Sequence, residues 1–200
     1  MIDDDKLIHR ISKKDPVAFE QLVKRYQSMV LNICRRLLGD YHQAEETAQD
    51  VFVQIFQKAS SFRRKSKVST WIYRIAVNRS LNMIRRNKRI RWMKDVGFSQ
   101  LDKYSEEKIQ FESKKNGPME LFERKEFRQI LQKAVDRLPE KQKAAFILNQ
   151  FEGLSAEEIS EILKVSINNV EVRIYRAKRK LQSFLIDQIK KNRSGGSLQK

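Results

Sequence analysis

Twelve Lys and Arg side chains, and no Asp or Glu, lie between Phe62 and Lys94. Four aromatic residues, Phe62, Trp71, Tyr73 and Trp92, are interleaved with these cations. Cations neutralise phosphates and aromatic rings stack on unpaired bases, so the combination predicts a surface for single-stranded nucleic acid. A run of cations without the rings would be typical of a solvated face. The twelve are Arg63, Arg64, Lys65, Lys67, Arg74, Arg79, Arg85, Arg86, Lys88, Arg89, Arg91 and Lys94.

The middle of this stretch has helical spacing. One face carries residues three and four positions apart: Trp71, Arg74, Asn78, Asn82 and Arg85. Apolar positions border this face on both sides, which predicts a helix whose polar strip faces outward. Two interpretations remain open for the strip. Its ring and amides bind an extruded base, or Trp71 belongs to the core and the arginines are ordinary surface.

A basic loop, residues 63–69, precedes this helix. Ser69 or Thr70 is the expected N-cap, because a side-chain hydroxyl can accept from the first free backbone N–H groups. A cationic loop directly before the helix is placed to hold a phosphate backbone while the helix holds a base.

The charge of the whole chain points to a polyanionic partner. The 200 residues contain 42 Lys and Arg against 25 Asp and Glu, a formal net charge of +17. The excess is local, because residues 1–62 hold nine acids and nine bases. A local excess favours nucleic acid over an acidic protein or a membrane surface.

Other residue classes carry little chemistry. Cys34 has no partner for a disulfide and is expected to be a small buried hydrophobe, while His9 and His42 lack ligand-spaced companions. We therefore expect neither a metal nor a cofactor, and no catalytic grouping indicates an enzyme. The acidic N-terminus does not resemble a secretory signal and no apolar run is long enough to span a membrane, which predicts a cytoplasmic, nucleoid-associated protein.

The fold expected is all-α, because six Gly, three Pro and no alternating apolar pattern leave almost only helical periodicity. We predict two helical domains, residues 1–94 and 119–188. A flexible linker, residues 95–118, joins them, and residues 189–200 form a flexible tail.

In the first domain, Asp15 with Pro16 starts one long helix, Gly39 ends it, and Asp40 starts the next. The second of these helices has a regular apolar stripe. Its opposite face is neutral to acidic, so it is either plain solvent surface or a docking surface for another protein. That face carries Glu46, Gln49, Asp50, Val53, Gln54 and Gln57.

The second domain contains a helix-turn-helix pattern. Ser155 and Glu158 form a capping box, a three-residue turn at residues 164–166 follows the short helix, and a longer basic helix comes next. The second helix of such a motif enters a DNA major groove, although a generic helical hairpin with a basic face would look similar. The candidate duplex-DNA residues are Ser166, Asn168, Asn169, Glu171, Val172, Arg173, Arg176 and Arg179.

Two segments then resemble a known family. The sequences AEETAQDVFVQIFQKASSF and STWIYRIAVNRSLNMIRR, within residues 19–91, are similar to region 2 of bacterial RNA polymerase sigma factors of the extracytoplasmic-function (ECF) group. The sequences LPEKQKAAFILNQFEGLSAEEISEILKVS and VRIYRAKRKL, within residues 138–181, resemble region 4. Two motifs in the family's order are more specific than one.

This resemblance implies a sigma factor that binds core RNA polymerase, selects promoters and helps to open DNA. The family's partners would be the clamp coiled coil of the largest polymerase subunit, the flap region through the C-terminal domain, promoter DNA and often an anti-sigma factor. The polymerase-binding set would be Glu46, Gln49, Asp50, Val53 and Gln54. The minus-ten single-strand set would be Arg63, Arg64, Lys65, Lys67, Trp71, Tyr73, Arg74, Asn78 and Arg85. The minus-thirty-five set would be the eight helix-turn-helix residues given above.

The chain departs from the family pattern in the recognition helix and its turn. Asn168-Asn169 stands where a Gly-Thr pair is usual, Glu171-Val172 where a cation and a small hydroxyl residue are usual, and Lys164 where Gly is common. Because Glu can accept from cytosine and Val can contact a thymine methyl, the base preference is expected to differ.

Two other functions fit the sequence less well. A stand-alone helix-turn-helix regulator needs a dimer to read two half-sites, and no heptad seam is present. An enzyme acting on nucleic acid needs a P-loop, metal-spaced carboxylates or a nucleophile with its base, and none of these is recognisable. Both leave the basic aromatic stretch less well explained than a promoter-binding subunit does.

Overall fold

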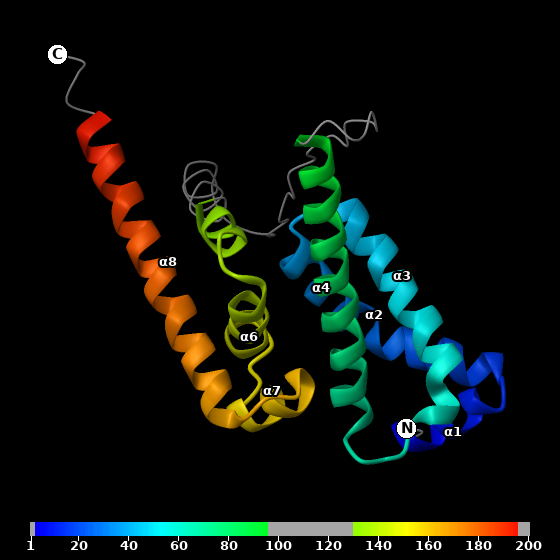
Figure 1. The fold of residues 1–200 in the computed structure, drawn as a ribbon. Coiled ribbons are helices and arrows are strands. Elements are labelled where there is room, and N and C mark those ends of the chain that lie inside the picture. The colour runs from blue at the N-terminus through cyan, green and yellow to red at the C-terminus, as the bar shows by residue number, and fades with distance from the viewer. Residues whose placement is uncertain (1–2, 96–129, 196–200) are drawn as a thin grey trace, which may run out of the picture. The chain divides into compact units, whose positions relative to one another are not determined.

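The computed structural model describes residues 3–95 and 130–195, and within them every regular element is a helix. The chain divides into two compact units. The N-terminal unit comprises α1 (Asp4–Ser12), α2 (Pro16–Leu38), α3 (Tyr41–Lys58), the short 3-10 helix η1 (Ala59–Ser61) and α4 (Val68–Asp95). We call the described residues 130–195 the C-terminal unit; they form the helical residues 130–136, α6 (Glu140–Gln150), α7 (Ala156–Leu163) and α8 (Ile167–Gly195). The all-α prediction is confirmed (Figure 1).

The core of the N-terminal unit lies where α2, α3 and α4 pack on one another. Each contributes the apolar stripe that its periodicity predicted, with Leu22, Ile55 and Ile72 fully buried. Cys34 is also fully buried, as expected. Burial raises the pKa of its thiol to about 11, so the thiol stays protonated and unreactive at neutral pH.

Helix α1 was not predicted. It packs against α2, α3, η1 and α4, and it buries Leu7, Ile8 and Ile11. Asp4, at its first turn, accepts hydrogen bonds from the side chains of Arg25 and Tyr26 on α2. Nine residues are too few for an isolated helix to be stable in water, so tertiary burial is what stabilises α1.

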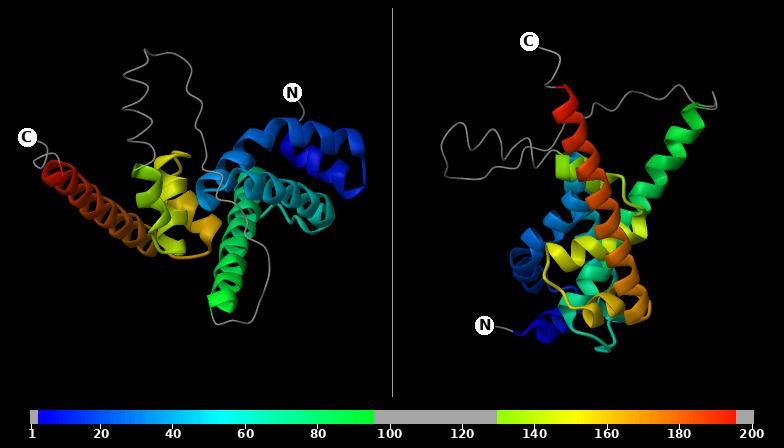
Figure 2. Two further views of the ribbon diagram at one scale, coloured as in Figure 1. Left: turned by 90° about the horizontal axis from the view of Figure 1, so that it is seen from above. Right: turned by 90° about the vertical axis from the view of Figure 1, so that its left-hand side faces the viewer.

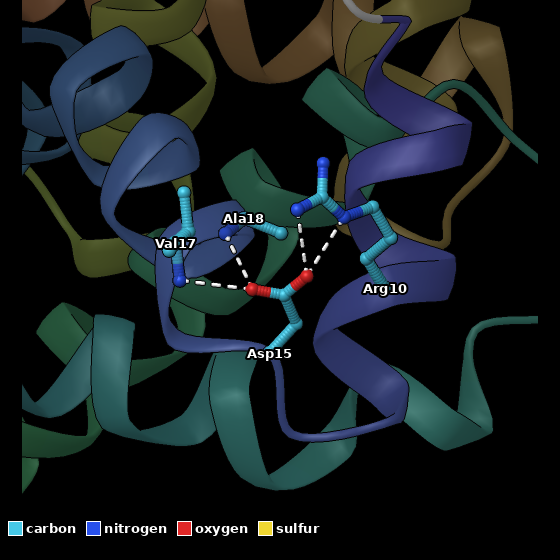
Figure 3. Close-up of polar contacts among 4 residues, drawn as sticks. All are labelled: Arg10, Asp15, Val17 and Ala18. Carbon is cyan, nitrogen blue, oxygen red and sulfur yellow. Dashed lines mark hydrogen bonds and ion pairs between the residues drawn. The ribbon is translucent and has the colours of Figure 1, made fainter.

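Asp15 joins α1 to α2 (Figure 3). One carboxylate oxygen accepts from the backbone N–H groups of Val17, at 2.9 Å, and Ala18, at 3.1 Å, as the predicted N-cap should. The other oxygen accepts from Arg10 of α1, at 2.8 Å from Nε and 2.7 Å from a terminal nitrogen. The Ala18 N–H and then Arg10 hold the pKa of Asp15 below its usual value.

We predict that Asp15→Ala lowers the thermal midpoint of the N-terminal unit at neutral pH. A carboxyl whose pKa is depressed on folding stabilises the fold above its unfolded-state pKa, and that stabilisation is lost as pH falls through the folded-state pKa. The difference between wild type and variant should therefore shrink as the solution is made acidic. Asp15→Asn keeps a capping oxygen but loses the charge facing Arg10, so its thermal midpoint should lie between those of the wild type and Asp15→Ala. A pH-independent difference would contradict this account.

The start of α4 differs from the expectation. Ser69 and Thr70 do not cap it, because the helix begins at Val68 and the N–H of Trp71 already donates to the carbonyl of Lys67 at 3.1 Å. Val68 and Thr70 are both buried, so packing of this first turn favours a helix that begins before the Ser69 and Thr70 hydroxyls can cap it.

The C-terminal unit is built on α6 and α8, which pack together. Ile147 and Leu148 of α6 and Val170 and Ala177 of α8 are buried. Lys143 is 5% exposed and its Nζ lies 2.7 Å from the carboxylate of Asp136, so its charge is paired inside the unit. Views from two further sides show α4 and α8 as unbroken helices (Figure 2).

Some expected segments have other bounds. Helix α8 continues to Gly195, so residues 189–195 of the expected flexible tail are helical, because neither Gly nor Pro occurs between Ile167 and Gly195. The expected linker, apart from Asp95 at the end of α4, and the first part of the second domain fall outside the described residues. The predicted turn of residues 164–166 is confirmed, since α7 ends at Leu163 and α8 begins at Ile167.

Candidate nucleic-acid interface

The basic loop connects η1 to α4 and presents its cations to solvent. Arg63, Arg64, Lys65 and Lys67 are all exposed. Arg64 has a φ of 53°, a left-handed conformation that costs a non-glycine residue energy. Cations on an exposed loop of fixed shape can meet successive phosphates of one strand.

Trp71 lies at the boundary between this loop and the core. Its side chain is half-buried, and its ring centroid is 5.2 Å from that of Phe62 with the planes tilted by 47°. The two interpretations of the residue are therefore not exclusive. One part of the indole is fixed by Phe62, and the remaining part is accessible to a stacking base.

The polar strip continues along α4 as its spacing predicted. Asn78, Asn82 and Arg85 are exposed, whereas Ile72, Ala76 and other core positions of the same helix are buried. Arg85 donates to the amide oxygen of Asn82 at 3.3 Å. Tyr73 and Arg74 lie in the first two turns of α4. The side-chain amide of Asn78 has no hydrogen-bond partner within the described part of the chain, which leaves it available to a base edge.

A second surface lies on the polar face of α3. Glu46, Gln49, Asp50 and Val53 are exposed, and the side chain of Val53 remains 52% accessible. His42 lies 3.6 Å from the Glu46 carboxylate across one helical turn. The face has no Lys or Arg of its own between residues 42 and 57, so it is unsuited to phosphate binding.

Gln54 of this face is less exposed because a residue of α4 reaches it. Arg79 donates from Nε to the Gln54 side-chain oxygen at 2.6 Å, and a terminal nitrogen of Arg79 lies 3.8 Å from the Asp50 carboxylate. Arg79 is one of the twelve cations of the basic stretch, although it is not a member of the minus-ten set. The structure turns its guanidinium toward α3.

The third surface is the outer face of α8, the recognition helix of the predicted motif. Asn168, Asn169, Glu171 and Val172 are exposed, and so are Arg176 and Arg179. Arg173 is partly exposed. Ser166 has a structural task, because its hydroxyl accepts from the backbone N–H of Asn169 at 3.3 Å and caps the helix.

The sequence reasoning missed one exposed aromatic on this helix. Tyr175 is 63% exposed, next to Arg176 and one turn after Val172. The spacing of three from Val172 and four to Arg179 could have assigned it to the outer face.

Both ends of α7, the helix that precedes the turn, have defined caps. The Ser155 hydroxyl accepts from the Glu158 N–H at 3.2 Å, and the Glu158 carboxylate accepts from the Ser155 N–H at 3.0 Å, which confirms the predicted capping box. Lys164 ends α7 in a left-handed conformation with φ 53°.

We predict that Lys164→Gly raises the free energy of unfolding by about 0.5–1 kcal/mol, because glycine adopts this conformation without steric cost. Chemical denaturation measures the change. Lys164→Ala is the matched control: it removes the same charge but keeps a Cβ, so it should not stabilise. Equal stabilisation by both variants would show that the gain comes from charge and not from backbone strain.

No grouping of His, Cys, Asp and Glu in residues 3–95 and 130–195 could hold a metal ion. None of the helices described is both long and apolar enough to cross a membrane.

Comparison with known proteins identifies both units. Residues 22–90 match the family model for Sigma-70 region 2, and residues 128–181 match that for Sigma-70 region 4. The chain is 32% identical to the ECF RNA polymerase sigma factor SigW of Bacillus subtilis over 184 residues, which cover 91% of this chain and 96% of SigW.

Two further relatives agree. The ECF RNA polymerase sigma-E factor of Escherichia coli is 32% identical over 184 residues, covering 91% of this chain and 94% of that protein. A solved structure of the sigma factor RpoE in complex with the anti-sigma factor NepR from Bartonella quintana has a TM-score of 0.63 at 23% identity, covering 84% of this chain and 96% of RpoE. The chain therefore belongs to the ECF group of RNA polymerase sigma factors, whose function is promoter-specific initiation of transcription.

Proposed function

We propose that the three exposed surfaces divide the work of a sigma factor among them. The polar face of α3 docks on core RNA polymerase, the basic loop with the α4 strip holds the opened minus-ten strand, and the outer face of α8 reads the minus-thirty-five duplex. Phosphate contacts position the protein and base contacts select the sequence. The protein supplies binding energy for promoter opening and carries out no chemical step itself.

One observation carries this proposal: cations and carboxylates are segregated between adjacent helices of one unit. The α4 stretch has no carboxylate between Phe62 and Lys94, whereas the α3 face has no Lys or Arg between residues 42 and 57. A surface of mixed polarity suits a protein partner, and a surface of cations with accessible rings suits a strand. The two can be occupied together because they lie on different helices.

The partners of relatives extend the proposal. The Bartonella quintana structure contains an anti-sigma factor bound to its sigma factor, and we propose that this chain is held inactive in the same way. We also propose that the C-terminal unit contacts the polymerase flap. The protein would act in the cytoplasm, at the nucleoid.

Base preference is the part of the proposal specific to this chain. Asn168 and Asn169 are exposed at the start of α8, where their amides can pair with adenine. Glu171 and Val172, also exposed, favour cytosine and thymine as neighbours.

Run-off transcription with core RNA polymerase tests the function. The chain should associate with core polymerase at physiological salt and produce defined start sites on fragments of its own genome. Sequencing the transcripts that overexpression induces would supply the promoters. Tight binding to an isolated promoter duplex, without association with polymerase, would instead favour a stand-alone helix-turn-helix regulator.

A further inference from the structure

We propose that Arg79, although it lies on the promoter helix α4, is a positioning residue of the polymerase-docking surface on α3. The inference rests on the proposed function of that surface. It assigns one cation of the basic stretch, which is not a member of the minus-ten set, to a protein partner.

The contacts of Arg79 carry the assignment. Its Nε donates to the Gln54 side-chain oxygen at 2.6 Å, and a terminal nitrogen lies 3.8 Å from the Asp50 carboxylate. Asp50 and Gln54 are four residues apart and therefore neighbours on one face of α3. One guanidinium thus holds two side chains of the docking surface, with 40% of its own side chain still accessible.

A second polar bridge between the same helices supports this arrangement. Asn87 of α4 donates to the Gln43 side-chain oxygen of α3 at 2.6 Å. Contacts at Arg79 and at Asn87, two turns apart on α4, set how the two helices lie against each other. Arg86 and Arg89 of α4 are exposed and make no hydrogen bond or ion pair with the described residues of α3.

The chemistry of the surface then defines its partner. Its exposed centre is Val53, which is 52% accessible and lies between Asp50 and Gln54 in the sequence. The guanidinium offsets the Asp50 charge and fixes the direction of the Gln54 side chain. The surface fits a polymerase element with an apolar side chain for Val53 and polar groups that pair with the Asp50 and Gln54 side chains held by Arg79.

Arg79→Met tests the assignment because it keeps the aliphatic stem and removes the guanidinium. The affinity for core RNA polymerase is expected to fall about tenfold, as for loss of one well-placed arginine at an interface. Affinity of the free chain for a labelled single-stranded oligonucleotide should stay within about twofold, because Arg79 faces α3. Arg86→Met is the matched control, with unchanged polymerase affinity and weaker, less salt-dependent oligonucleotide binding.

A double-mutant cycle distinguishes positioning of the Asp50 and Gln54 side chains from a general contribution of Arg79 to stability. In an Asp50→Ala, Gln54→Ala background, Arg79→Met should cause little further loss of polymerase affinity, since the side chains that it positions are gone. Arg79→Lys keeps the charge but lacks the planar fork, so it should restore affinity only in part. Thermal unfolding of every variant checks that the unit remains folded.

Three outcomes would overturn the inference. In the first, Arg79→Met weakens oligonucleotide binding as much as Arg86→Met does and leaves polymerase affinity intact. In the second, its effect on polymerase affinity is the same in both backgrounds of the cycle. In the third, the loss of affinity matches a loss of thermal stability. Failure of the wild-type chain to bind core polymerase would instead reject the proposed function of the α3 face.

Discussion

Asn78→Ala is expected to reduce promoter opening by about 10-fold to 100-fold while leaving the N-terminal unit folded. The side chain is exposed on α4 and has no hydrogen-bond partner in the described residues, so its removal disturbs no internal contact. An amide that holds an extruded base contributes only after the strands separate. Polymerase association and initial duplex binding should therefore persist, and permanganate footprints should show a smaller melted bubble.

Trp71 provides the companion variant for this prediction. Trp71→Phe keeps a ring beside Phe62, which lies 5.2 Å away in the wild type, and reduces the stacking area offered to a base. The expected loss of opening is smaller than for Trp71→Ala, which also removes a packing contact and should lower stability. Base stacking is worth about 1–3 kcal/mol per base by alanine substitution. Unchanged footprints in both Asn78→Ala and Trp71→Phe would show that the strand lies elsewhere.

The second large effect is expected on duplex recognition. Arg173→Ala should reduce discrimination among minus-thirty-five sequences by about 1–3 kcal/mol if the guanidinium pairs with a guanine. Arg173 lies in the second turn of α8, where the N-terminal residues of a recognition helix reach base edges, and it is partly exposed. Start-site selection by the holoenzyme on a promoter library measures the discrimination.

Arg179→Ala is the control on the same helix. It is exposed more than one turn further along α8, so it is expected to meet phosphates and not bases. Its loss should weaken binding to all duplexes alike and reduce the slope of log affinity against log salt concentration by about one. If Arg173→Ala behaves identically to Arg179→Ala, then Arg173 is a phosphate contact and the specificity resides in the departures at Asn168 and Asn169.

Much of the local structure could be predicted because short-range rules decide it. Asp15 and Asp40 cap α2 and α3, and Ser155 with Glu158 forms the capping box of α7, as their residue types and spacing indicated. These interactions join groups within a few residues of one another, so composition and spacing suffice. The same applies to the exposed strip of α4, which follows from a 3.6-residue period.

The errors occurred where long-range packing outweighs such rules. Helix α1 depends on burying Leu7, Ile8 and Ile11 against other helices, and its acidic first turn concealed the pattern. The hydroxyls of Ser69 and Thr70 are good capping groups, yet burial of Val68 starts α4 before them. In both cases the decisive contacts come from residues distant in sequence.

The functional surfaces show the same division. Sequence by itself determined the family, the order of the described helices after α1, and which faces of α3, α4 and α8 are polar, since these depend on residue identity and helical period. Tertiary structure alone decided that Arg79 turns to α3, that Trp71 is half fixed by Phe62, and that Ser166 is used as a cap. The direction of a long side chain depends on which acceptors neighbouring helices place within its reach, and helix packing sets those distances.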